Sequence, residues 1–210
     1  MIKIAIFGIT GQTGKNILEI VSNNSNYKIK ALIRKNTSTS SNFQNINYIV
    51  GDILNQNDVD KNIENCDCVI SVIGHKKNSN SELQTLAIKN IINSMKKYNV
   101  KRIISLTGTG VRISGDKISL IDKLANFIIK KVDSKRISDG INHYNILKNT
   151  DLDWTILRVL KLTNINKIEK YTLTENGPAK TFISRKTVAK IIIDLIDDKV
   201  FLKKLPVISK

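Results

Sequence analysis

The chain of 210 residues is 41% hydrophobic, which suits one globular domain with a sizeable core and excludes a disordered chain. Its formal net charge of +16 comes from 28 lysines and 6 arginines spread along the whole sequence. Because aromatic residues are few and no DNA- or RNA-binding motif occurs, we interpret this charge as a solvated basic surface, not a nucleic-acid site. No apolar run reaches the roughly 18 to 20 residues of a membrane span. Because the first residues already form a strand pattern, we expect no signal peptide.

Two cysteines, Cys66 and Cys68, stand two positions apart in an apolar segment. A disulfide between residues so close in an extended segment is geometrically unfavourable, and two thiols alone are too few for a zinc site. We therefore expect reduced thiols in a cytoplasmic protein.

In the first half of the chain, short apolar runs alternate with helical patterns. The expected strands are residues 2–7, 27–34, 47–52, 66–74 and 100–108. Helical patterns begin at about residue 13 and cover 57–63 and 79–98, and a polar stretch at 35–45 is expected to be a loop. Alternation of this kind, with central strands that are apolar on both faces, predicts a doubly wound parallel sheet covered by helices on both sides.

The second half continues the pattern without an internal repeat or a flexible linker, so we expect residues 1–210 to form one domain. An amphipathic segment at 118–129 precedes a helix that runs to about residue 148 and a strand at 154–159. The remainder predicts a strand pair around 171–184, a helix from about 185 and a short strand near 205–209.

Three glycines, Gly8, Gly11 and Gly14, follow the first strand in the segment "KIAIFGITGQTGKN". The first permits a tight turn, the second lets backbone approach a pyrophosphate, and the third lets helix and strand pack closely. The helix that follows would direct its N-terminal amides at the phosphates. Because a strand precedes the triplet and a helix follows it, the segment predicts a dinucleotide site. Further hydroxyls and amides in the loop come from Thr10, Gln12 and Thr13.

The end of the second strand indicates which dinucleotide binds. An NAD-specific site usually ends this strand with an acidic residue for the ribose 2′-hydroxyl. This chain has Arg34 followed by Lys35 instead. A guanidinium at that position would pair with the 2′-phosphate of NADP through charge-assisted hydrogen bonds, so the sequence favours NADP(H) over NAD(H).

Taken together, these residues resemble the short-chain dehydrogenase/reductase superfamily, in its atypical NAD(P)-binding branch. The resemblance is to the family of biliverdin reductase B and flavin reductase, and it covers nearly the whole chain. It rests on the segments "KIAIFGITGQTG", "GDILNQNDVDKNI" and "GPAKTFISRKTVAKIII". It implies a Rossmann-like fold with a small C-terminal extension on the substrate side. It also implies NADPH-dependent hydride transfer to flavins and tetrapyrroles, in which the cofactor supplies the chemistry.

The same resemblance implies further positions in the cofactor site. Asp52 and Ile53 would flank the adenine, and the segment from Ser71 through Val72 and Ile73 to Gly74 would pass beneath the ribose. Thr107, Gly108 and Thr109 would approach the nicotinamide.

The catalytic positions of the family match less well. Where the flavin reductases carry a serine this chain has Gly108, with Thr107 just before it, and where they carry a histidine it has Lys161. We therefore name Thr107 and Lys161 as the candidate catalytic residues. The Tyr-x-x-x-Lys acid pair of the superfamily would fall near residues 136 and 140, where it is absent. The sequence "YNILK" at 144–148 spells that pattern about two helical turns late, and we interpret it as a coincidence, with the neighbouring His143 as a surface or packing residue.

The sequence leaves three functions open. The first is an NADPH-dependent reductase of a flavin, a quinone or a similar planar acceptor. The second is a non-catalytic redox sensor of the nitrogen metabolite repressor type, and the third is a nucleotide-sugar epimerase or dehydratase. In each case the ligand is expected beyond the carboxyl ends of the strands, where the order of the strands reverses. The segment 118–129 could fold over that cleft as an apolar wall, although ordinary packing is the interpretation we favour for it.

Overall fold

A large sheet of eight strands runs through the molecule. The structure is a computed structural model and describes residues 1–22, 24–35, 43–75 and 80–210. The strand order of the large sheet is β3-β2-β1-β4-β5-β6-β10-β8, and all neighbours are parallel except β10 and β8. A second sheet pairs β7 with β9. The strands are β1 (Ile2–Phe7), β2 (Tyr27–Ile33), β3 (Ile46–Val50), β4 (Cys68–Ser71), β5 (Arg102–Gly108), β6 (Asp153–Val159), β7 (Leu162–Thr163), β8 (Thr172–Thr174), β9 (Ile183–Ser184) and β10 (Val207–Ser209).

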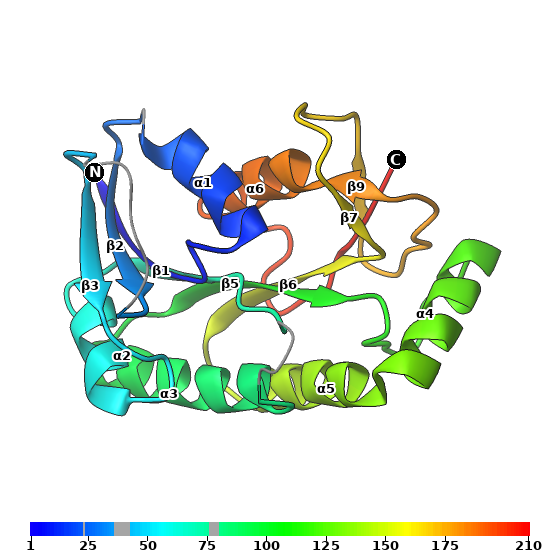
Figure 1. Ribbon diagram of the computed structural model, residues 1–210, viewed down its shortest axis with the longest axis horizontal. Helices are drawn as coiled ribbons and strands as arrows, with labels where there is room; N and C mark the ends of the chain where they lie inside the picture. Colours follow the sequence, from blue (N-terminus) through cyan, green and yellow to red (C-terminus); the bar gives the residue numbers. More distant parts are fainter. Residues whose placement is uncertain (23, 36–42, 76–79) are drawn as a thin grey trace.

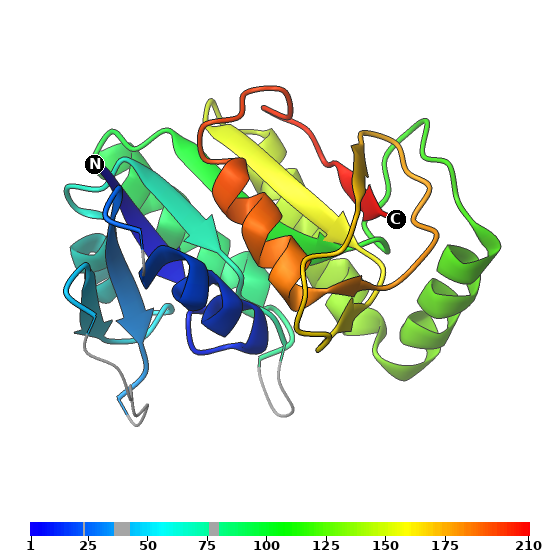
Figure 2. The same ribbon diagram turned by 90° about the horizontal axis from the view of Figure 1, so that it is seen from above.

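Helices cover the large sheet on both faces (Figure 1). The helices of the chain are α1 (Gln12–Ser22), α2 (Gln56–Ile63), α3 (Leu83–Lys97), α4 (Leu120–Val132), α5 (Ser134–Lys148) and α6 (Arg185–Asp194), and all except α4 take part in this cover. Helices α1 and α6 lie side by side on one face, and α2, α3 and α5 lie on the other (Figures 1 and 2). This is the doubly wound, Rossmann-like α/β fold that the alternating pattern predicts, so the predicted fold class is confirmed.

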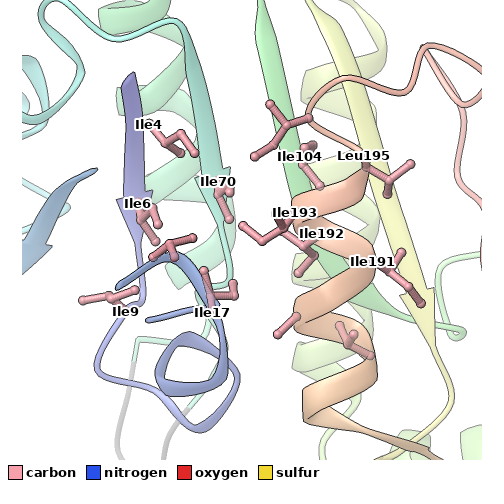
Figure 3. Close-up of a cluster of buried hydrophobic side chains, with 14 of the residues drawn as sticks. Ile4, Ile6, Ile9, Ile17, Ile70, Ile104, Ile191, Ile192, Ile193 and Leu195 are labelled. Carbon is pink, nitrogen blue, oxygen red and sulfur yellow. The ribbon is translucent and has the colours of Figure 1, made fainter. Parts of the chain in front are cut away.

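The alternation of strand residues divides the core into two layers. Successive side chains of a strand point to opposite faces of the sheet, so Ile4 and Ile6 of β1 pack towards α1 and α6, as Figure 3 shows, while Ala5 and Phe7 pack towards α2 and α3. Burial on both faces explains why the central strands are apolar at nearly every position.

Two expectations for the strands need correction. The predicted strand pair at 171–184 is wrong: β8 pairs antiparallel with β10, and β9 pairs with β7. Both short strands find partners from distant parts of the chain, which local sequence does not reveal. Strand β2 ends at Ile33, one residue earlier than expected, so that Arg34 lies just beyond the strand. The predicted start of the long helix at residue 79 and most of the loop at 35–45 lie outside the described residues.

Helix α4 stands apart from the layered core, at one end of the sheet (Figures 1 and 2). Its only fully buried residue is Asp122, and most of its large apolar side chains are exposed. The favoured interpretation of segment 118–129 as ordinary packing is therefore wrong for most of its apolar residues. Within the described part of the chain, no helix is both long and apolar enough to cross a membrane.

Candidate functional site

Two cavities lie along the carboxyl ends of the parallel strands. The order of strands reverses between β1 and β4, which are direct neighbours, and such a switch point opens a crevice in doubly wound sheets. The larger cavity has a volume of about 640 Å³ and the smaller of about 280 Å³. The residues that line both are Thr10, Gly11, Val72, Ile73 and Gly74. The two cavities therefore meet at the loops that follow β1 and β4.

The loop after β1 is shaped by its glycines. Gly8 has a φ of +91°, and a Cβ there would lie 2.9 Å from the backbone of Val72. A Cβ on Gly14 would lie 2.2 Å from the carbonyl oxygen of Gly8, so this glycine allows α1 to pack against the loop. At Gly11 the nearest protein atom to such a Cβ is that same oxygen, at 3.2 Å, and Gly11 lines both cavities. The loop and the first turn of α1 form an anion-binding arrangement of backbone amides.

The smaller cavity lies at the ends of β2 and β3. Arg34 is exposed and lines it, as do Asp52 and Ile53. The backbone N–H of Asp52 donates to Asp58 Oδ2 at 3.0 Å, and Asp52 Oδ1 accepts from the N–H of Leu54 at 2.9 Å. These bonds fix the turn after β3 and hold Asp52 at the cavity wall.

The larger cavity lies beyond the ends of β5 and β6. Thr107 and Gly108 line it at the end of β5, and Thr107 is buried. A Cβ on Gly140 of α5 would lie 2.9 Å from Thr107 Oγ1. The absence of a side chain at Gly140 therefore leaves the space that the Thr107 hydroxyl occupies.

Thirteen of the sixteen predicted cofactor positions line one cavity or both. These are Gly8, Thr10, Gly11, Gln12, Thr13, Arg34, Asp52, Ile53, Val72, Ile73, Gly74, Thr107 and Gly108. Three do not: Gly14 is buried in packing, Ser71 is buried within β4, and Lys35 is exposed beside Arg34.

The predicted catalytic residues are separated. Thr107 faces the larger cavity, and so do Val159 and Leu160 at the end of β6, whereas Lys161 is exposed and is not among the residues that line it. The Nζ atom of Lys161 lies 5.1 Å from the centre of the Phe182 ring. The ammonium group of Lys161 therefore lies near Phe182, and the prediction that Lys161 belongs to the catalytic site gains no support from the residues that line the cavity.

The residues of "YNILK" also lie away from both cavities. The Tyr144 ring packs edge-on against Trp154 at a centroid distance of 6.0 Å. His143 is buried, with Nε2 3.0 Å from Ser105 Oγ, and burial lowers its pKa to about 4. His143 is therefore a packing residue that stays neutral at physiological pH.

A polar cluster on the wall of the larger cavity was not predictable from any local sequence pattern. His75 lines the cavity, and its Nε2 lies 2.8 Å from Oδ2 of the fully buried Asp139. Asp139 also accepts from the backbone N–H groups of Gln84 and Thr85, each at 2.8 Å, and so caps the start of α3 from α5. The two bonds from α3 to Asp139 depend on the packing of α3 against α5, and they join residues more than fifty positions apart.

Two arginines add positive charge to the larger cavity. Arg136 and Arg185 both line it. Arg136 Nε lies 3.3 Å from Asp133 Oδ2, and Arg185 NH1 donates to Asn164 Oδ1 at 2.5 Å. Burial lowers the pKa of Arg185. Arg136 lies near the position at which the resemblance led us to expect the tyrosine of a Tyr-x-x-x-Lys pair.

Residues 8–199 match the model of a family described as NAD(P)H-binding. The match extends from the first glycine of the loop after β1 to beyond α6, and so covers both cavities. The chain belongs to this NAD(P)H-binding family.

Several solved structures have the same fold as this chain. A short-chain dehydrogenase/reductase from Veillonella parvula, in complex with NADP, has a TM-score of 0.85 at 18% identity, over 100% of this chain and 94% of that one. ChuY, an anaerobillin reductase from Escherichia coli O157:H7, has a TM-score of 0.80 at 19% identity, over 99% and 96%. A protein from Bacillus halodurans described as an NAD-dependent epimerase/dehydratase has a TM-score of 0.80 at 18% identity, over 100% and 94%. The chain therefore shares the overall fold of these three proteins.

Proposed function

We propose that this chain is an NADPH-dependent reductase that transfers a hydride to a flavin, a quinone or a similar planar acceptor. The observation that carries the proposal is the meeting of two cavities at Thr10, Gly11 and Val72–Gly74. A dinucleotide with its pyrophosphate at this junction would extend into the smaller cavity with one nucleoside and into the larger with the other.

The residues present fit such a cofactor. Gly8 and Gly14 have backbone within 3 Å of where a side chain would begin, and Gly11 faces the junction of the cavities. In the proposal, the amides at the start of α1 hold the pyrophosphate and Arg34 pairs with a 2′-phosphate, which favours NADPH. Bound NADPH would supply the hydride and its two electrons.

The larger cavity is suited to a flat acceptor. Apolar side chains of Val111, Ile129 and Leu160 line it together with the two arginines. In the proposal these apolar walls hold the rings, and the arginines attract anionic substituents of the acceptor. Most of the rate effect then comes from orientation, because ring stacking places donor and acceptor at reacting distance.

A dedicated proton donor is not required by this proposal. The positions expected for the Tyr/Lys pair hold Arg136 and Gly140, neither of which serves as an acid at neutral pH. The hydride adds to the acceptor, and the electron pair left on the reduced acceptor takes a proton from solvent. The Thr107 hydroxyl would position the nicotinamide or the acceptor by a hydrogen bond.

The missing acid pair also favours a second candidate, a dinucleotide-binding redox sensor without catalysis. An epimerase or dehydratase is less well supported because it needs that acid pair. The two buried cysteines, which form no disulfide, support a cytoplasmic location in either case.

Steady-state oxidation of NADPH by the purified protein, with FMN and a dye as acceptors, distinguishes the two candidates. The reductase predicts turnover that saturates in both NADPH and acceptor. NADPH binding without any turnover, across flavin and quinone acceptors, would contradict the reductase and favour the sensor.

A further inference from the structure

The outward face of α4 is apolar, an arrangement opposite to that of an ordinary surface helix. Large apolar side chains on this helix are more than half exposed, among them Leu124 at 62%, Phe127 at 60% and Ile128 at 52%. The remaining exposed apolar residues of the helix are Leu120, Ile121 and Val132. At 3.6 residues per turn these positions fall on one contiguous face. Contiguous apolar patches of this kind on soluble proteins mark interaction sites.

The inward face of α4 is polar and is bonded to the loop that follows β5. Thr109 Oγ1 donates to Asp122 Oδ1 at 2.6 Å, and Asn126 Nδ2 donates to the same carboxylate oxygen at 2.6 Å. Arg112 NH2 lies 3.5 Å from Asp122 Oδ2. These contacts hold the helix in place and leave its apolar face directed away from the core.

The charges around the apolar face are almost all positive. Residues 117–135 contain five lysines and two aspartates. Asp122 is buried in the inward network, and Asp133 lies 3.3 Å from Arg136. Lys123 and Lys130 are exposed seven positions apart, so they follow the same edge of the helix. The face therefore combines apolar side chains with unneutralised basic ones.

We propose that this face of α4 docks on an anionic lipid surface. A helix that lies in the membrane interface buries its apolar side chains at the acyl boundary, and its lysines reach the headgroups. Anionic headgroups add attraction to each nearby lysine. The combination of an apolar face, basic edges and a net charge of +16 matches these requirements.

A second copy of the chain would match the face less well. Self-association through α4 would bring the lysines of the two copies together, in molecules that each carry +16. Like charges at the edge of an interface oppose association, whereas an anionic surface neutralises them. The residues of α4 that line the larger cavity are Asn126 and Ile129. Docking through the exposed apolar residues would therefore not cover the cavity.

Co-sedimentation of the full chain with lipid vesicles tests the proposal without any measurement of turnover. We expect binding to vesicles of phosphatidylcholine mixed with phosphatidylglycerol, and much weaker binding to phosphatidylcholine alone. High salt should weaken the binding to the mixed vesicles, because it screens the lysines. Failure to bind the mixed vesicles at low salt would overturn the proposal and leave the proposed reductase activity unaffected.

Substitutions separate the apolar contribution from the charge. Leu124→Ser and Phe127→Ser should each weaken binding to mixed vesicles about tenfold or more, as expected for the loss of a large buried apolar side chain. Val200→Ser changes a side chain that is 66% exposed elsewhere and should leave binding unchanged. Lys130→Gln combined with Lys131→Gln should weaken binding to mixed vesicles roughly tenfold, whereas Lys28→Gln on β2 should have little effect.

Two controls test whether the serine variants stay folded and whether a second copy covers the face. Thermal unfolding and NADPH affinity should be unchanged in the serine variants, because the replaced side chains are exposed. Sedimentation equilibrium without lipid tests whether a second copy of the chain covers the face. If the wild type is a dimer and Leu124→Ser converts it to a monomer, the lipid proposal is overturned. Equal vesicle binding by wild type and Leu124→Ser would overturn it as well.

Discussion

Gly140 on α5 and Thr107 at the end of β5 are in such close contact that a Cβ on the glycine would lie 2.9 Å from the threonine Oγ1. The same Cβ would lie 2.9 Å from Val111 Cγ2. The hydroxyl of Thr107 therefore keeps its place on the cavity wall only because residue 140 lacks a side chain.

Thr107→Val keeps the shape of this side chain and removes the hydroxyl. If the hydroxyl positions the acceptor or the nicotinamide, kcat/KM should fall roughly ten- to a hundredfold, the effect of one positioned hydrogen bond. NADPH affinity should change little, and both quantities can be measured in the NADPH oxidation assay and by direct titration. Full activity would remove Thr107 from the mechanism, and loss of NADPH binding would assign it to the cofactor pocket instead.

Arg34→Ala tests the preference for the 2′-phosphate. The wild-type protein should bind NADPH at least about tenfold more tightly than NADH, because a hydrogen-bonded ion pair with a phosphate contributes ~1.5 to 3 kcal/mol. The variant should lose most of this preference and keep its affinity for NADH. Lys28→Ala, which changes an exposed lysine at the other end of β2, is the matched control. Equal affinities for the two cofactors in the wild type would contradict the assignment.

Gly11→Val tests the assignment of the loop after β1. A branched side chain would occupy the junction of the two cavities, so binding of NADPH and NADH should both be abolished. The fold should survive, because the new Cβ would press on one atom, the Gly8 carbonyl oxygen at 3.2 Å, and a shift of a few tenths of an ångström in this loop would relieve the contact. Gly14→Ala provides the contrast: its Cβ would lie 2.2 Å from the Gly8 carbonyl oxygen, and overpacking should destabilise the fold by roughly 1–3 kcal/mol. Thermal unfolding without cofactor distinguishes the two, and a folded Gly11→Val protein that still binds NADPH would show that the loop has another role.

His143 should make stability depend on pH on the acidic side. Burial lowers its pKa from 6.5 to about 4, so below pH 6.5 the unfolded chain binds a proton that the folded chain excludes. Above pH 6.5 this histidine leaves the free energy of unfolding unchanged. As the pH falls from 6.5 towards 4, the free energy of unfolding decreases by roughly 3 kcal/mol in total. Urea unfolding of wild type and His143→Gln at several pH values measures this: the variant should show a shallower loss of stability over that interval. Identical slopes would mean that His143 takes up its proton in the folded state.

The sequence was sufficient for features that depend on local pattern and on general topology. The apolar runs predicted a parallel sheet, and the rule that loops converge at the carboxyl ends of strands predicted that Gly8, Gly74 and Thr107 lie at one crevice. Features that depend on tertiary packing were not predictable. The contact of His75 with Asp139 requires α3 and α5 to lie side by side, and the partners of β8 and β9 come from distant segments. The exposed face of α4 was missed because an amphipathic pattern shows only that one side is apolar, not that this side meets the core.

Because both cysteines are buried, we expect the folded chain to react only slowly with thiol reagents. Burial raises the pKa of Cys66 to about 11 and of Cys68 to about 12, and the reactive thiolate is therefore scarce at neutral pH. A single cysteine introduced on the surface, for instance at position 124, could be labelled selectively with a fluorophore while the native pair remains unmodified. Uptake of label by the unsubstituted chain would in turn report transient opening of the sheet around the start of the central strand β4. The two native cysteines can therefore serve as a probe of local unfolding.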